Sequence, residues 1–126
     1  MTTVTRIHYS RTRHVLELAF DDGSEGELSA EFLRVHSPSA EVRGHTPGQE
    51  VLQTGKRNVA ITTINAVGHY AVQLVFDDGH DSGIFTWSYL LELVQDNAGL
   101  WKRYLKAVQA AHSSRDPELQ VLHFKP

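Results

Sequence analysis

Alternating hydrophobic and polar positions in the first quarter of the chain predict a small antiparallel sheet. HVLELAF, at 14–20, places its leucines and Phe20 on one face of an extended chain and its other residues on the opposite face. This period of two is typical of a half-buried strand. VTRIHY, at 4–9, alternates in the same way and predicts an edge strand, and SEGEL, at 24–28, predicts a short return strand.

A second pair of strands is predicted near the middle of the chain. NVAITTINAV, at 58–67, is alternating and rich in β-branched residues, which favour strands. YAVQLVF, at 70–76, follows after a turn at Gly68 and His69 and runs back beside it. This pair is the strongest strand prediction in the sequence.

The tetrapeptide FDDG occurs twice, at 20–23 and 76–79, each time directly after a predicted strand. Aspartate side chains cap turn amides and glycine adopts positive φ, so FDDG predicts a hairpin turn. Both copies continue with a short return strand, a hydroxyl residue and a helical pattern. The first copy has Ser24 where the second has His80, so the turn itself does not need a histidine.

Apolar residues at helical spacing predict helices after each return strand and near the C-terminus. Ser29 is the expected N-cap of a short helix, and Thr86 that of a longer one. The two longer apolar faces consist of Trp87, Leu90, Leu91 and Val94, and of Trp101, Tyr104, Leu105 and Val108. We expect Trp87, Trp101 and Tyr104 to belong to the core and Tyr89 to be exposed. A break at 96–99 separates the helices.

These elements predict an α+β fold, a small β-rich domain of antiparallel hairpins with short helices and a C-terminal helical segment. Residues 36–57 lack periodicity and contain several prolines and glycines, which predicts a long ordered loop. The 126-residue length fits one domain. We expect this domain to span 1–112, followed by a flexible C-terminal tail at 113–126.

Composition excludes several function classes. The net charge is −3 and the pI is about 6.2, which argues against binding to nucleic acid or to an anionic membrane. The chain has no cysteine, so thiolate metal sites and disulfides within it are excluded. Neither a signal peptide nor an apolar run of roughly 18 residues is found, so we expect a cytoplasmic protein.

Three segments in order resemble the DUF971 family. They are ELSAEFLRVHSPSAEVRGH at 27–45, GHYAVQLVFDDGHDSGIFTWSYLLEL at 68–93 and LWKRYLKAV at 100–108. The family comprises small bacterial relatives of the N-terminal domain of γ-butyrobetaine hydroxylase and trimethyllysine hydroxylase. The resemblance covers about residues 4–108 and implies a compact β-rich domain with helical additions.

The resemblance also implies a departure from the hydroxylases at their structural zinc. In those enzymes the zinc is held by three cysteines and a downstream histidine. Here Ser37, Ser39 and Val42 stand at the cysteine positions, and His80 matches the histidine. Serine is a poor zinc ligand and valine is none. The catalytic domain of the hydroxylases has no counterpart in this chain, so we carry over neither iron catalysis nor 2-oxoglutarate.

Two hypotheses of function follow. The leading hypothesis is a non-enzymatic binding or adaptor domain, accessory to metal or iron–sulfur protein maturation, because related domains occur fused to iron–sulfur carrier ATPases of the Mrp type. The expected partner is such an ATPase or another metalloprotein. The expected partner-binding residues are Arg34, Ser37, Pro38, Ser39, Glu41, Arg43 and His45.

The alternative hypothesis is a metal-binding domain that holds a zinc or iron ion, which would be its one cofactor. Imidazole and carboxylate groups suit such ions. The candidate ligands are His80 as the anchor with His36, His45, Asp78 and Asp81. We favour a structural turn over a metal site here because the best ligands are missing. Catalysis by a serine nucleophile, at Ser37, Ser39 or Ser82, has no supporting motif.

Overall fold

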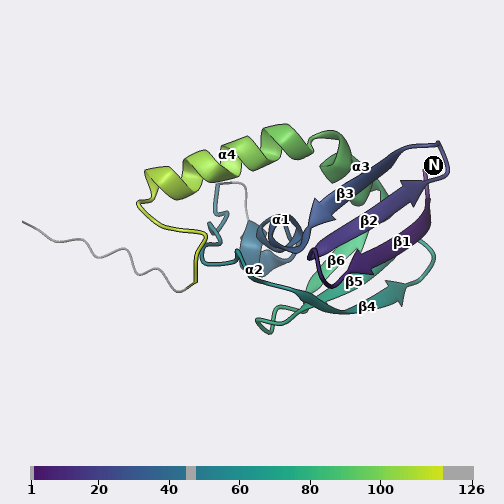
Figure 1. Ribbon diagram of the computed structural model, residues 1–126, viewed down its shortest axis with the longest axis horizontal. Helices are drawn as coiled ribbons and strands as arrows, with labels where there is room; N and C mark the ends of the chain where they lie inside the picture. The colour runs from purple at the N-terminus through teal and green to yellow at the C-terminus, as the bar shows by residue number, and fades with distance from the viewer. Residues whose placement is uncertain (1, 45–47, 118–126) are drawn as a thin grey trace, which may run out of the picture.

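The computed structural model describes residues 2–44 and 48–117, and it shows an α+β domain built from two similar halves (Figure 1). Each half is a three-stranded antiparallel sheet followed by a helix. The first consists of β1 (Val4–Ser10), β2 (Val15–Phe20), β3 (Glu25–Ser29) and α1 (Ala30–Val35). The second consists of β4 (Ile61–Val67), β5 (Ala71–Phe76), β6 (Gly83–Thr86) and α3 (Trp87–Gln95). The predicted α+β fold is confirmed.

Two further helices lie outside this repeat. α2 (Ala40–Arg43) is a single turn inside the predicted loop at 36–57, and α4 (Asn97–Ala110) follows the break after α3. In both sheets the strand order is sequential, so β2 and β5 are the central strands. The predicted pair at 58–67 and 70–76 is confirmed as β4 and β5, which meet at the Val67–Ala71 register position.

One hydrophobic core joins the two sheets and the helices. The central strand β2 contributes Leu16, Leu18 and Phe20, the face predicted from its alternation, and β5 contributes Leu74 and Phe76. Figure 1 shows the second sheet behind the first, with α1 and α3 at the ends of their third strands. Because both sheets bury their apolar faces in the same cluster, neither half is expected to be stable alone.

The two FDDG turns have the same hydrogen bonds. Gly23 N donates to Phe20 O and Gly79 N to Phe76 O, both at 3.1 Å. Both glycines have positive φ, 88° and 91°. In each turn the second aspartate accepts from the amide two residues later, Asp22 from Ser24 and Asp78 from His80. The repeated sequence therefore encodes a repeated turn, as predicted.

The predicted N-caps are confirmed. The side chains of Ser29 and Thr86 accept from the amides of Phe32 and Tyr89. On α3 the buried residues are Leu90 and Leu93, whereas the predicted face included Leu91 and Val94, which are only half-buried. α3 packs against β3 on one side and against α4 on another. Its buried face is therefore rotated around the helix axis from the face that the apolar spacing predicted.

The first residues of the expected tail pack against the domain. Arg115 forms a bidentate ion pair with Glu31 of α1, with N···O distances of 2.7 and 2.8 Å, and lies over the Trp101 ring. Gly55 N donates to Ser114 O. The packed part of the chain thus extends past the expected boundary at residue 112, and 118–126 lie outside the described residues. In the described part, no helix has the length and apolar character needed to cross a membrane.

Candidate functional site

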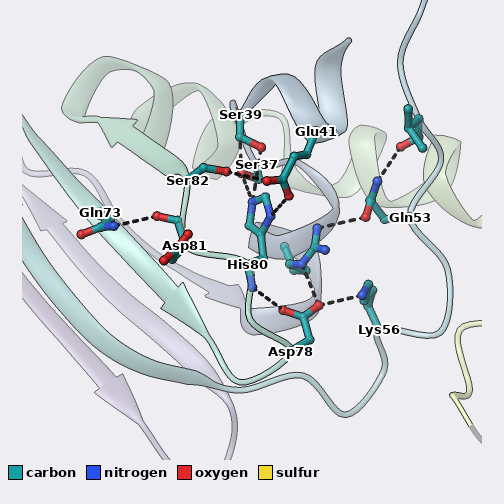
Figure 2. A network of polar contacts seen from close by, with 12 residues as sticks. Ser37, Ser39, Glu41, Gln53, Lys56, Gln73, Asp78, His80, Asp81 and Ser82 are labelled. Atoms are coloured by element: carbon teal, nitrogen blue, oxygen red, sulfur yellow. Dashed lines mark hydrogen bonds and ion pairs between the residues drawn. The ribbon is translucent and has the colours of Figure 1, made fainter.

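His80, in the second FDDG turn, is buried against the segment that follows α1 (Figure 2). Its Nε2 lies 2.8 Å from Ser37 Oγ and 3.4 Å from Ser39 Oγ. Its Nδ1 lies 2.9 Å from Glu41 Oε2. The imidazole is 1 % exposed, whereas the Glu41 side chain is 67 % exposed. The second FDDG turn and residues 34–44 therefore form one unit. Residues 34–44, which include the end of α1 and all of α2, are called the docking loop below.

The partners of His80 define its hydrogen-bonding roles. A carboxylate only accepts, so Nδ1–H donates to Glu41, and in the neutral ring Nε2 accepts from the Ser37 hydroxyl. Ser82 Oγ donates to the other oxygen of Glu41 at 3.4 Å. A neutral imidazole is thus satisfied at both nitrogens, which is what burial of a polar ring requires.

A glycine at the start of β6 permits this close approach. A Cβ on Gly83 would lie 2.4 Å from Ser37 Oγ and 3.0 Å from the Phe85 ring. Its hydrogen atom alone separates the backbone of β6 from the Ser37 hydroxyl, so the docking loop sits directly on the strand.

Substituting Gly83 with alanine is expected to lower the free energy of unfolding by about 2 kcal/mol, because an added methyl group displaces the buried hydroxyl. Gly99→Ala is the matched control. Gly99 lies in α4 with nothing within 4 Å of its Cβ position, so this change should stabilise by about 0.5–1 kcal/mol. Urea unfolding of both variants measures the difference. Equal effects would contradict the close approach at Gly83.

Asp78 is a second node of the same unit. Its Oδ2 accepts from Arg34 Nε at 2.9 Å and from Lys56 Nζ at 2.6 Å, and its Oδ1 accepts from His80 N at 3.1 Å. Burial alone would raise the pKa of Asp78. The bonds from Lys56 and His80 and the charge of Arg34 outweigh burial and lower this pKa to about 2.

This lowered pKa predicts a loss of stability in acid. A carboxyl whose folded pKa lies below its unfolded value stabilises above the unfolded pKa, and the contribution disappears as pH falls through the folded pKa. For Asp78 the window runs from 3.8 down to about 2. After allowance for its partial exposure, we expect about 1–2 kcal/mol. Asp78→Asn should flatten this part of the pH dependence of unfolding, whereas Asp81→Asn should not.

Gln53 connects the Asp78 node to α4. Its side chain, labelled in Figure 2, accepts from Arg34 Nη1 at 3.0 Å and donates to Val51 O. Its backbone carbonyl accepts from the Tyr104 hydroxyl at 2.7 Å. Burial, with the nearby Glu31 charge, raises the pKa of Tyr104 to about 12, so the phenol remains a donor at neutral pH. These bonds hold residues 51–53 beside α4, and this segment is called the wall below.

A groove of about 470 Å³ lies between the docking loop, this wall and α4. Its lining is mostly apolar, and Arg43 and Arg103 stand among the lining residues. Arg43 also lies over the Tyr89 ring, 4.7 Å from its centroid. Tyr89, which we expected to be exposed, is half-buried because its hydroxyl donates to His36 O at 2.6 Å.

The candidate metal ligands do not gather around one point. His36 Nδ1 lies 3.0 Å from Phe32 O and its ring lies against Phe32, on the groove side. Asp78 is engaged with Arg34 and Lys56, and exposed Asp81 contributes a backbone carbonyl to Gln73. His45 lies outside the described residues. Among those described, no three His, Cys, Asp or Glu side chains form a group suited to a metal ion.

The contacts of His80 have the connectivity of a serine–histidine–acid triad. A substrate cannot reach the Ser37 hydroxyl, however, because the Ser37 side chain is fully buried and Gly83 lies against its oxygen. A nucleophile must reach a substrate carbonyl, and this hydroxyl has no space for one. The arrangement can hold the docking loop on the turn, and it offers no open reactive group.

Comparison with known proteins agrees with this architecture. The family model described as gamma-butyrobetaine hydroxylase-like, N-terminal, matches residues 7–91. The chain belongs to this family. A search of curated proteins finds no match.

Three solved structures resemble this family member over most of its length. Two solution NMR structures share 46 % and 45 % sequence identity with this chain, with TM-scores of 0.83 and 0.80. The alignment to the first covers 98 % of both chains, and the alignment to the second covers 100 % of this chain and 95 % of that chain. A crystal structure from Acidithiobacillus ferrooxidans, of a protein with unknown function in the DUF971 family, shares 40 % identity. It covers 72 % of this chain and 91 % of its own, with a TM-score of 0.60.

The family assignment bears on the two serine hydroxyl groups that lie beside His80. Ser37 and Ser39, at positions where the resemblance placed cysteines, both lie within hydrogen-bonding distance of His80, and Val42 is buried beside the groove. Three of the four positions that the resemblance matched to zinc ligands are thus joined by hydrogen bonds. In this DUF971 domain, hydrogen bonds join the docking loop to the turn.

Several residues of the site carry no signal in the sequence. Gln53 and Lys56 come from the aperiodic loop, and Tyr104 comes from a helix that is distant in sequence. Glu41 was among the expected partner-binding residues, but its bond to His80 was not predicted. Pro38 is half-buried between the two serines. Two signals pointed to this place: the position of His80 in a repeated turn that does not need it, and the family resemblance, which grouped His80 with Ser37 and Ser39.

Proposed function

We propose that this domain is a non-enzymatic binding or adaptor module that docks a protein partner through the docking loop and the second FDDG turn. One observation carries the proposal: His80 and Asp78 tie these two distant segments into a single polar unit, and its outer side chains, such as Glu41, remain exposed. A rigid surface built from two segments reduces the conformational entropy lost on binding.

The proposed cellular role is accessory to metal or iron–sulfur protein maturation. It rests on the family resemblance, because related domains occur fused to iron–sulfur carrier ATPases. The chain has no cysteine, so thiolate ligands for any cluster would come from the partner. The partner we propose is a carrier ATPase of the Mrp type or another metalloprotein.

An NMR titration of the ¹⁵N-labelled domain with a purified Mrp-type carrier ATPase tests this function. We expect saturable changes at amides of 34–44 and 76–83. Asp81→Lys should weaken the interaction, because it reverses an exposed charge in the second turn. Glu25→Lys is the matched control, since Glu25 is exposed at the equivalent position after the first turn. Changes confined to other surfaces, or equal effects of both variants, would contradict the proposal.

The same sample distinguishes the adaptor from a metal-binding domain. An adaptor should give the same spectrum with and without EDTA, and Zn²⁺, Fe²⁺ or Mn²⁺ added anaerobically should produce only weak, scattered shifts at histidines. Saturable, stoichiometric shifts at His80 that disappear in His80→Ala would instead establish a metal site.

A further inference from the structure

We infer that the groove between the docking loop and α4 binds an acidic, amphipathic segment of the protein partner. This inference rests on the proposed function, and it adds which surface is used and what chemistry the partner must present. Three features of the groove carry the inference: its apolar floor, its cationic rim and the rigidity of its walls.

The floor of the groove is apolar and comes from three separate elements. Val35 ends α1, Val42 belongs to α2, and Leu100, Tyr104 and Ala107 are the apolar and aromatic groove-lining residues of α4. His36 also lines the groove, where burial and the charge of Arg103 lower its pKa, so the ring is neutral at pH 7. Such a floor accepts aliphatic or aromatic side chains by removing their surface from water.

Exposed apolar side chains continue the floor onto one wall. Val51 is 53 % exposed and Leu52 is 38 % exposed, and both line the groove. Large apolar side chains that gather beside a concave apolar surface are typical of a protein-binding site rather than of an ordinary surface. A peptide segment can cover Val51 and Leu52 together with the floor, which favours such a segment as the occupant.

The charges around the groove are mainly positive, although the whole chain has a net charge of −3. Arg43 of α2 and Arg103 of α4 line it, and Glu50 is the one acidic lining residue within 2–44 and 48–117. α4 contains Lys102, Arg103 and Lys106 and no acidic residue. A positive region attracts acidic partners and repels the same region of a second copy of this chain. Charge complementarity therefore favours an acidic segment as the occupant and disfavours a symmetric contact of two copies through the groove.

The walls are already fixed without a partner. Val51 N donates to Val42 O at 2.7 Å, and Gln53 links Arg34 to the Tyr104 hydroxyl. The network of His80 and Asp78 thus extends beyond the turn, since Arg34 links Asp78 to Gln53, whose carbonyl accepts from the Tyr104 hydroxyl of α4. A preformed groove suits the mode in which an amphipathic helix lays apolar anchors into a cleft.

Fluorescence anisotropy with two synthetic peptides tests the inference. The first is a fluorescein-labelled peptide with leucine at i, i+3, i+4 and i+7 and glutamate elsewhere; the second has lysine in place of glutamate. We expect saturable binding of the glutamate peptide, at least tenfold weaker binding of the lysine peptide, and a loss of affinity as salt increases. NMR shifts should map to Val42, Val51 and Ala107.

Matched variants on α4 locate the site. Arg103→Gln should weaken binding of the glutamate peptide about threefold to fivefold. Lys102 precedes Arg103 on α4 and does not line the groove, so Lys102→Gln should change the affinity less than twofold. Ala107→Glu should weaken it at least tenfold, and Gln109→Glu serves as its control. Circular dichroism of each variant verifies folding. Equal binding of both peptides, or shifts mapping elsewhere, would overturn the inference.

The carrier ATPase titration separates this inference from the proposed function. If Asp81→Lys weakens docking of the ATPase while Ala107→Glu leaves it unchanged, the adaptor function stands and the groove inference fails. If neither variant affects docking, both fail. If both weaken it, the groove and the docking loop form one interface.

Discussion

Replacing His80 with alanine is expected to lower the free energy of unfolding by about 3–4 kcal/mol, because it removes a buried ring and leaves the Ser37 hydroxyl with only the 3.4 Å bond from Ser39 N. Ser37 is fully buried, and the Nε2 of His80, at 2.8 Å, is its nearest side-chain partner. Glu41 would also lose its bond to Nδ1. Urea unfolding followed by fluorescence of the two tryptophans measures this loss.

The control for His80 is His69→Ala. His69 is exposed in the turn between β4 and β5, and its backbone carbonyl accepts from Trp87 Nε1, a bond that alanine preserves. We expect a change within about 0.5 kcal/mol. A His80→Ala variant as stable as the His69 control would contradict the role of the imidazole. It would also remove the reason to treat the docking loop and the turn as one rigid unit.

The second large effect is expected at the C-terminal segment. Arg115→Met should destabilise the domain by about 3 kcal/mol, because Glu31 is then left buried without its charge partner. Glu31 is 5 % exposed and its carboxylate forms both bonds to Arg115. Methionine keeps much of the aliphatic length of arginine, so the loss reports mainly on the ion pair and on the Trp101 contact.

A double substitution tests this interpretation. Glu31→Gln together with Arg115→Met removes both charges, so it should recover more than half of the stability lost in Arg115→Met alone. Thermal or urea unfolding of the two single variants and the double variant forms the cycle. Additive losses would show that the two side chains act independently, and a neutral Arg115→Met would show that residues 113–117 do not stabilise the domain.

The sequence by itself determined the local structure, because each part of it depends on neighbours in the chain. Alternation in 14–20 placed Leu16 and Leu18 in the core, and the repeated FDDG gave two turns with equal hydrogen bonds. Ser29 and Thr86 cap helices with side chains that reach only three residues onward. The comparison of the two turns also identified His80 as a residue that the turn does not require.

Only the tertiary structure decided what His80 does. Its partners Ser37 and Glu41 lie 43 and 39 residues away, and Arg34 reaches Asp78 across 44 residues. No local pattern specifies such pairs, since they depend on how the second half of the fold packs against the loop after α1. The groove has the same origin: its lining comes from α1, α2, the aperiodic loop, α3 and α4, and sequence spacing does not reveal that these segments meet.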